Sequence, residues 1–107
     1  MSEQKKNRRQ MLEEFLAARP NDAFSRYGLA LECLNVGDAA AAEEHFRKLI
    51  ETNPDYVPGY QQLGQLLAGQ SRRDEARRVL SAGVTVAHKR GDQHARSEME
   101  TLLTELA

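Results

Sequence analysis

The sequence predicts an all-α protein, a right-handed stack of antiparallel helix pairs with about six helices. Apolar residues recur at steps of three and four, as at Leu29, Ala30 and Cys33, which is the spacing of one helix face. No segment of the 107-residue chain alternates with the two-residue period of a strand. The chain also aligns with itself at an offset of 34 residues, which places Pro20 over Pro54. A repeat of that length is typical of one helix pair in a stacked array.

Five turn signals divide the chain into the six expected helices. Each signal pairs a helix-stopping residue with a plausible N-cap. The signals lie at residues 19–22, 36–38, 53–55, 69–71 and 90–92. The helices expected between them span residues 3–18, 22–36, 39–52, 57–69, 72–90 and 93–106. Isolated helices of three to four turns are marginal in water, so packing must stabilise them.

Local features support individual helices. Pro58 falls near the start of the fourth expected helix, where its fixed φ favours helix entry. Ser71 stands three residues before Asp74, a spacing that resembles a capping box with a shorter acid. His88 takes the place of a third proline in the 34-residue period, so we expect the fifth helix to run about one turn longer, to Gly91.

The repeat aligns small residues with small residues and large residues with large ones. The aligned pairs are Leu29 with Leu63, Ala30 with Gly64, Ala42 with Ala76, and Phe46 with Leu80. Two antiparallel helices approach closely only where one side chain is small, and large side chains fill the remaining space. The period therefore predicts two helix pairs that pack in the same way.

These positions resemble the tetratricopeptide repeat family, whose 34-residue unit carries Leu, small, Ala, aromatic and Pro residues at fixed spacings. The first unit supplies Leu29, Ala30, Ala42, Phe46 and Pro54, and the second supplies Tyr60, Leu63, Gly64, Ala76 and Leu80. The chain departs from the pattern at Arg26, which replaces a large aromatic, and at Leu49 and Gly83, which replace a small Ala. The resemblance implies an α-solenoid with a concave face.

The repeat also predicts the domain organisation. Residues 1–107 form one domain, with a half-repeat helix at 1–20, repeats at 23–56 and 57–91, and a capping helix at 92–107. In the half-repeat, Leu12 and Phe15 are expected to face inward. The cap presents an apolar seam of Met99, Leu102, Leu103 and Leu106.

Composition and charge limit the classes of function. The net charge of −1 gives no overall field that would attract nucleic acid or an anionic membrane. Cys33 is the single cysteine, so an intramolecular disulfide is excluded and a reducing compartment is favoured. Because no apolar run is long enough for a membrane span or a signal peptide, we expect a cytoplasmic protein.

No group of residues predicts catalysis, a metal site or a cofactor. The three histidines, His45, His88 and His94, show no His-x-x-x-His spacing, and no Cys-x-x-Cys exists. Cys33 lies on an apolar helix face, where burial suppresses the thiolate. The scattered glycines form no phosphate-binding loop. We therefore expect a protein that is not an enzyme and holds no cofactor.

The family resemblance implies that a partner binds along the first helix of each pair. The matching residues are Phe24, Tyr27, Leu31, Leu34, Asn35, Gln61 and Gln65. The first five form a largely apolar row and the last two an amide row. At the positions that form the carboxylate clamp of heat-shock co-chaperones, this chain lacks the Lys and Asn residues of the clamp, so an acidic C-terminal peptide is not the expected ligand. The expected partner is therefore a protein or peptide, in the form of an amphipathic helix or an extended apolar segment.

Three alternatives remain open at this point. The N-terminal helix could fill the concave groove itself. The end helices could pair between chains and give a homodimer that acts as an assembly scaffold. Nucleic-acid binding through the arginines of the fifth helix is disfavoured, because Glu75 dilutes the cluster, Asp74 and Arg78 can form an i, i+4 pair, and no aromatic residue is interleaved.

Overall fold

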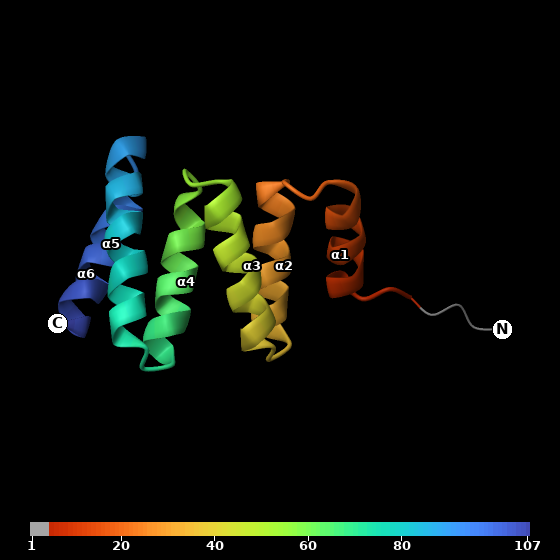
Figure 1. The fold of residues 1–107 in the computed structure, drawn as a ribbon, viewed down its shortest axis with the longest axis horizontal. Coiled ribbons are helices and arrows are strands. Elements are labelled where there is room, and N and C mark those ends of the chain that lie inside the picture. Colours follow the sequence, from red (N-terminus) through yellow and green to blue (C-terminus); the bar gives the residue numbers. More distant parts are fainter. Residues whose placement is uncertain (1–4) are drawn as a thin grey trace.

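Within residues 5–107, six α-helices follow one another in alternating directions (Figure 1). The computed structural model describes residues 5–107, and this part of the chain contains helices and no strand. The helices are α1 (Arg8–Ala18), α2 (Ala23–Asn35), α3 (Ala39–Thr52), α4 (Val57–Gly69), α5 (Arg73–Arg90) and α6 (Gln93–Leu106). The all-α prediction is confirmed, and α3, α4 and α6 have the predicted bounds.

Each helix packs against the next one in the chain, and α4 also contacts α6. The result is an elongated stack of 56 × 27 × 20 Å, with α1 at one end and α6 at the other (Figure 1). The first helices of successive units therefore share one side. We call the surface formed by α2, α4 and α6 the even-helix face, and the surface formed by α3 and α5 the odd-helix face.

The first helix begins later than the sequence pattern predicted. The Asn7 side chain accepts a hydrogen bond from the Gln10 backbone N–H at 2.8 Å, and the Gln10 side chain accepts one from the Asn7 N–H at 3.0 Å. This reciprocal capping box fixes the helix start at Arg8. The expected start at residue 3 was wrong for the described residues 5–7, and residues 3 and 4 lie outside the described part.

The expected capping box at the start of the fifth helix was also wrong. Arg72 is the N-cap of α5 and its side chain makes no cap hydrogen bond. Ser71 has a φ of 61°, in the left-handed region that non-glycine residues rarely adopt. In the turn between α4 and α5, Ser71 instead donates its backbone N–H to the Ala68 carbonyl. The fifth helix is longer than α3, as predicted, and it ends at Gly91 with a φ of 72°.

Small residues lie where the helices approach one another. Ala42 and Ala76 have no exposed surface, as the repeat predicted. A Cβ atom on Gly64 would lie 2.5 Å from the Leu80 Cγ, so α4 and α5 can approach this closely only with glycine there. These contacts connect the repeat pattern directly to helix packing.

Gly83 stands where the family pattern has a small Ala, and it lies at the contact between α5 and α6. A Cβ atom at this position would lie 2.6 Å from the Met99 Sδ and 2.7 Å from the Tyr60 Cβ. The missing side chain leaves a notch on α5 that the large Met99 side chain of α6 fills, and Met99 is 1% exposed. The capping helix is thereby fixed on α5, with Leu106 also buried and Leu102 and Leu103 partly buried.

The inward face of α1 differs from the prediction. Leu12 packs against the core and Leu16 is buried, whereas Phe15 is 44% exposed. Leu16 lies one turn after Leu12 on the same stripe of the helix, and Phe15 lies beside that stripe. The Arg19 guanidinium covers the Phe15 ring at 5.2 Å from its centroid. Phe15 is therefore a surface residue.

Candidate protein-interaction surface

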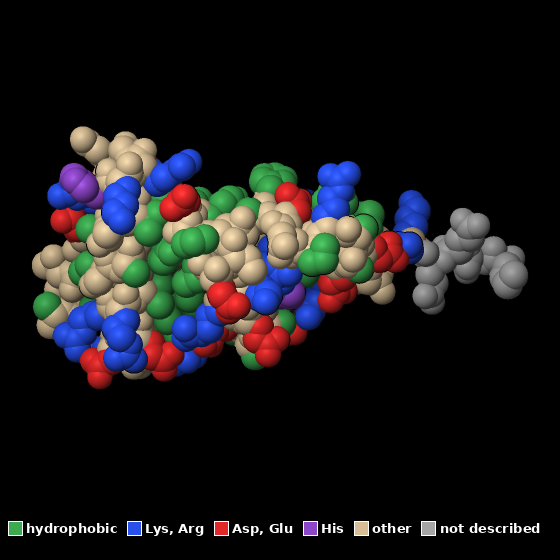
Figure 2. All heavy atoms as spheres, turned by 45° about the horizontal axis from the view of Figure 1, so that its top comes forward, with side chains coloured by type: hydrophobic (Ala, Val, Ile, Leu, Met, Phe, Trp, Pro, Cys, Tyr) green, Lys and Arg blue, Asp and Glu red, His purple; other side chains and the backbone are tan. Residues whose placement is uncertain are grey.

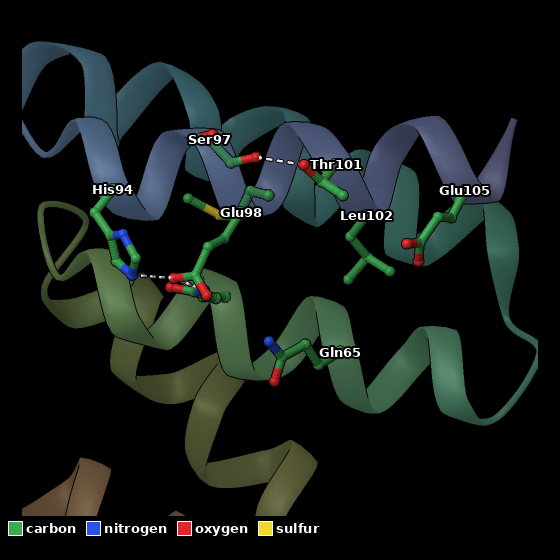
Figure 3. A pocket seen from close by; sticks show the side chains of 9 residues that line it. Gln65, His94, Ser97, Glu98, Thr101, Leu102 and Glu105 are labelled. Carbon is green, nitrogen blue, oxygen red and sulfur yellow. Dashed lines mark hydrogen bonds and ion pairs between the residues drawn. The ribbon is translucent and has the colours of Figure 1, made fainter.

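A groove on the even-helix face separates α4 from α6. It has a volume of about 400 Å³. Gln61, Gln65, His94, Ser97, Glu98, Met99, Thr101, Leu102 and Glu105 line it. Figure 3 shows Gln65 rising from α4 and Leu102 and Glu105 descending from α6 toward the space between the two helices. We call this site the even-helix groove.

Glu98 connects the two walls of the even-helix groove. Its Oε1 atom accepts a hydrogen bond from the Gln61 Nε2 of α4 at 3.1 Å, and the His94 Nε2 of α6 lies 3.1 Å from the same oxygen. His94 precedes Glu98 by one helical turn, so both side chains project from the same side of α6 (Figure 3). Glu98 is thus held across the groove while half of its side chain stays exposed.

The structure divides the predicted site residues into two sets. Gln61 and Gln65 line the even-helix groove. The five predicted residues of α2 lie outside it. Of these, Phe24 is 77% exposed, Asn35 is exposed, and Leu31 and Leu34 are partly buried against the core.

Tyr27 has a structural role that the sequence pattern did not predict. Its ring lies 6.3 Å from the ring of Phe46 in α3 and 5.5 Å from the ring of Tyr56 at the start of α4. Tilted aromatic contacts of this kind stabilise packing between elements. Tyr27 therefore packs α2 against α3 and against the N-cap residue of α4, and a change at Tyr27 would disturb the fold together with any bound partner.

The contribution of α6 to the groove was missed. The predicted site stopped at α4 because residues 92–107 were assigned as a cap. Five polar or ionisable residues of α6 nevertheless line the groove: His94, Ser97, Glu98, Thr101 and Glu105. The repeat pattern contained a signal for this contribution. Because α6 follows a complete repeat, it takes the place of the first helix of a third repeat, shifted along the sequence by the extra turn of α5.

The N-terminal helix lies away from the even-helix groove. It packs on α2 at the far end of the stack (Figure 1). Leu12 of α1 faces Gly28, and Arg8 lies 3.6 Å from the carboxylate of Glu32. Phe24, on the same helix as these contacts, keeps most of its surface exposed. No residue of α1 lines the groove between α4 and α6.

A second hollow lies on the odd-helix face, between α3 and α5. Its volume is about 390 Å³. Arg47, Ile50, Tyr60, Glu75, Arg78, Val79 and Ala82 line it. Figure 2 shows hydrophobic side chains gathered in a hollow beside α5. This surface offers a matched control for any test of the even-helix face.

Ion pairs join the two repeats across the odd-helix face. Arg72 contacts Glu43 at 2.6 Å and Glu75 at 2.7 Å, and Arg47 contacts Glu75 at 2.8 Å. The Arg72 guanidinium lowers the pKa of the Glu43 carboxyl more than burial raises it. Charge-assisted bonds in such a network help to fix the second helices of the two repeats relative to each other.

Carboxylates pair with some of the arginines at the start of α5, and this pairing disfavours nucleic-acid binding. Arg72 belongs to the ion-pair network, and Arg77 contacts Asp74 at 2.7 Å. Asp74 thus pairs with Arg77, where the sequence spacing had suggested Arg78. Figure 2 shows acidic side chains among the basic ones at this end of α5. The mixture reduces the positive field available to phosphates.

Side chains that could bind a metal or act as a nucleophile bear on the expectation that the protein is not an enzyme. No cluster of three His, Cys, Asp or Glu side chains suited to a metal occurs within residues 5–107. Cys33 is a buried free thiol, and burial raises its pKa. Its thiolate is therefore suppressed at neutral pH.

His45 is half-buried and lies beside Arg26. The Arg26 Nη1 is 3.2 Å from the His45 Nδ1, and because arginine only donates, Nδ1 accepts and the ring is neutral. Burial, and then the charge of Arg26, lower the pKa of His45 below its ordinary value of 6.5.

The lowered pKa of His45 predicts a pH-dependent stability. The unfolded chain binds a proton on His45 more readily than the folded chain, so this contribution is present above pH 6.5 and is lost as the pH falls below it. The melting temperature should drop by a few degrees between pH 7.5 and pH 5.5. In a His45→Gln variant the drop should be smaller, and an equal drop in both proteins would contradict the assignment.

Comparison with known proteins places this architecture in a family. A family model described as tetratricopeptide repeat matches residues 34–98. A TPR repeat-containing protein of Pseudomonas aeruginosa is 34% identical over 95 residues, which cover 89% of this chain and 90% of the relative. The chain belongs to the tetratricopeptide repeat family.

Solved structures agree with this assignment. The tetratricopeptide repeat domain protein of Salinibacter ruber superimposes with a TM-score of 0.77 at 38% identity, covering 81% of this chain and 88% of that one. A protein from Bordetella parapertussis gives a TM-score of 0.79 at 28% identity, covering 95% and 89%. The tetratricopeptide fold generally mediates protein–protein interaction, and its members are generally non-catalytic scaffolds. None of the helices described here is both long and apolar enough for a membrane span.

Proposed function

We propose that this tetratricopeptide protein is a non-catalytic interaction module that binds a peptide or partner helix on its even-helix face, which forms the concave side of the stack. The observation that carries the proposal is the open groove of about 400 Å³ between α4 and α6, into which the predicted Gln61 and Gln65 project. Grooves between helices are common binding sites for extended or helical segments. A reducing compartment such as the cytoplasm suits the free thiol of Cys33.

Phe24 extends the proposed site onto α2. Among the described residues, Phe24 is the most exposed of the large hydrophobic side chains, with 77% of its surface accessible. Aromatic residues are enriched among those that dominate binding energy in interfaces. The partner is therefore expected to cover Phe24 and the amide side chains of α4 together.

A paired set of variants tests the proposal. Peptides selected from a random 16-residue display library on the full chain should bind a Phe24→Ala/Gln65→Ala variant at least about tenfold more weakly, because each substitution removes a direct contact. Both residues are exposed, so the melting temperature should change little. Affinity is measured by calorimetry. Arg78→Ala, in the hollow of the odd-helix face, is the control and should bind normally.

Self-association is the second candidate function, and one observation favours it. The outer face of α1 exposes Met11 by 53% and Phe15 by 44%, where a preceding helix would lie in a longer array. Sedimentation of the same samples separates the two candidates. A constant monomer mass, with peptide binding that is lost in the variant, supports the interaction module. A mass that rises with concentration, with unchanged peptide binding in the variant, favours assembly through α1.

A further inference from the structure

The three helices of the even-helix face present different chemistry. Phe24 and Leu31 make the α2 part apolar. The α4 part carries Gln61 and Gln65, and α4 contains no charged residue at all. The α6 part carries Glu98 and Glu105. The face therefore changes from apolar to amide to acidic along the stack.

The carboxylates of the even-helix groove lack a basic neighbour among its lining residues. Glu98, Glu105 and His94 are the titratable residues that line it, and neither Lys nor Arg does. On the odd-helix face, by contrast, the carboxylates of Glu43 and Glu75 are paired with guanidinium groups. The groove is thus acidic at neutral pH, and its negative charge is left for a partner to neutralise.

Glu98 is held in a position suited to a cationic ligand. The Gln61 and His94 side chains both approach its Oε1 atom. No hydrogen bond within residues 5–107 involves its Oε2 atom, which stays available. The apolar Leu102 lies one turn further along α6 and also lines the groove (Figure 3). A carboxylate beside an apolar surface suits a Lys or Arg side chain, whose methylene stem packs while its head forms the ion pair.

We propose that the partner segment is basic at one end and apolar at the other, with Lys or Arg side chains over Glu98 and Glu105 and apolar side chains over Phe24 and Leu31. This inference rests on the proposed function of the even-helix face. The segment must cross α4 to reach from α2 to α6 (Figure 1), and with helix diameters of about 10 Å this is a span of at least roughly 20 Å. An extended segment of about six residues or a helix of about 13 residues has that reach.

Selection from a random 16-residue peptide library, long enough for either the extended or the helical form, tests the charge assignment. We expect peptides selected on the full wild-type chain to be enriched in Lys or Arg at one end and in Leu, Phe or Met at the other. They should bind a Glu98→Gln/Glu105→Gln variant about tenfold more weakly. Selection on a Glu98→Lys/Glu105→Lys variant should enrich Asp and Glu instead. Binding to the wild type should weaken between 50 and 500 mM NaCl.

A charge-matched control excludes a general effect of net charge. Glu44 and Glu51 are exposed residues of α3, on the opposite face, and a Glu44→Gln/Glu51→Gln variant removes the same two charges. This variant should bind the selected peptides as the wild type does. Equal weakening in both Gln variants would show a long-range charge effect and overturn the placement of basic side chains at Glu98 and Glu105.

The outcomes also separate this inference from the proposed function. Two results would overturn the charge assignment but leave the proposed interaction module intact. In the first, the selected peptides depend on Phe24 and Gln65 but lack basic residues. In the second, they depend on Phe24 and Gln65 but bind the Glu98→Gln/Glu105→Gln variant as tightly as the wild type. Peptides insensitive to Phe24→Ala/Gln65→Ala would overturn both proposals. A library without any enriched peptide would count against both as well.

Discussion

Removal of residues 93–107 should abolish cooperative unfolding and leave an aggregating product. These residues form α6, whose Met99 fills the notch at Gly83 and is 1% exposed in the intact chain. Without α6, the apolar surfaces of α4 and α5 beneath it would face water. In a stacked array each unit is stabilised only by its neighbours. No other part of the chain can therefore replace the packing contacts that are lost with the end helix.

Three measurements check this expectation. Circular dichroism should show a broad, shallow melting curve, sedimentation should show aggregates, and a dye for exposed apolar surface should bind more strongly than to the intact chain. A Met99→Ala variant of the full chain is the control. It should lose roughly 3 kcal/mol of stability through the cavity it creates, yet remain monomeric and melt in one transition. A monomeric truncated chain that melts cooperatively would refute the structural role of α6.

The fold was predictable where local sequence signals decide the structure. The turns at Gly37 and Gly91, both with positive φ, coincide with turn signals in the sequence. The small residues at Ala42 and Ala76 mark close helix contacts through the 34-residue period. The start of α1 was missed because a capping box at Asn7 overrides the helical tendency of the residues before it.

Contacts between residues that are distant in the sequence could not be predicted from the sequence alone. Arg72 pairs with Glu43, 29 residues away, only because α3 and α5 meet on the odd-helix face. The Tyr27 ring likewise packs on the ring of Tyr56, which lies 29 residues further along the chain. Predicting which residues of α6 line the groove requires the register of α6 against α4. The 34-residue period alone does not give this register, because α5 is about one turn longer than the repeat expects. The spacing of apolar residues identifies the buried face of one helix, but it does not identify the helix that packs against that face.

The close approach of α4 to α5 predicts a large effect for one added methyl group. In a Gly64→Ala variant the new Cβ atom would lie 2.5 Å from the Cγ atom of Leu80, which is fully buried. Overpacking of this kind costs typically 1–3 kcal/mol, while replacing glycine in a helix returns at most about 1 kcal/mol. Because Leu80 is fully buried, we expect an overpacking cost at the upper end of this range, about 3 kcal/mol. The net loss of stability should then be about 2 kcal/mol, or about 10 °C in melting temperature.

A second glycine of the same helix separates the steric effect from helix propensity. No atom lies within 4 Å of a Cβ placed on Gly69, so Gly69→Ala should leave the melting temperature unchanged or raise it slightly. Removing the obstacle should also remove the penalty: in a Leu80→Ala background, where the baseline is lower, Gly64→Ala should cost much less than in the wild type. Equal losses at both glycines, or a penalty that persists without Leu80, would contradict the close contact. In that case the small residues of the repeat could not explain how the two helices approach, and the register of the stack, which positions α4 beside α6, would need another physical cause.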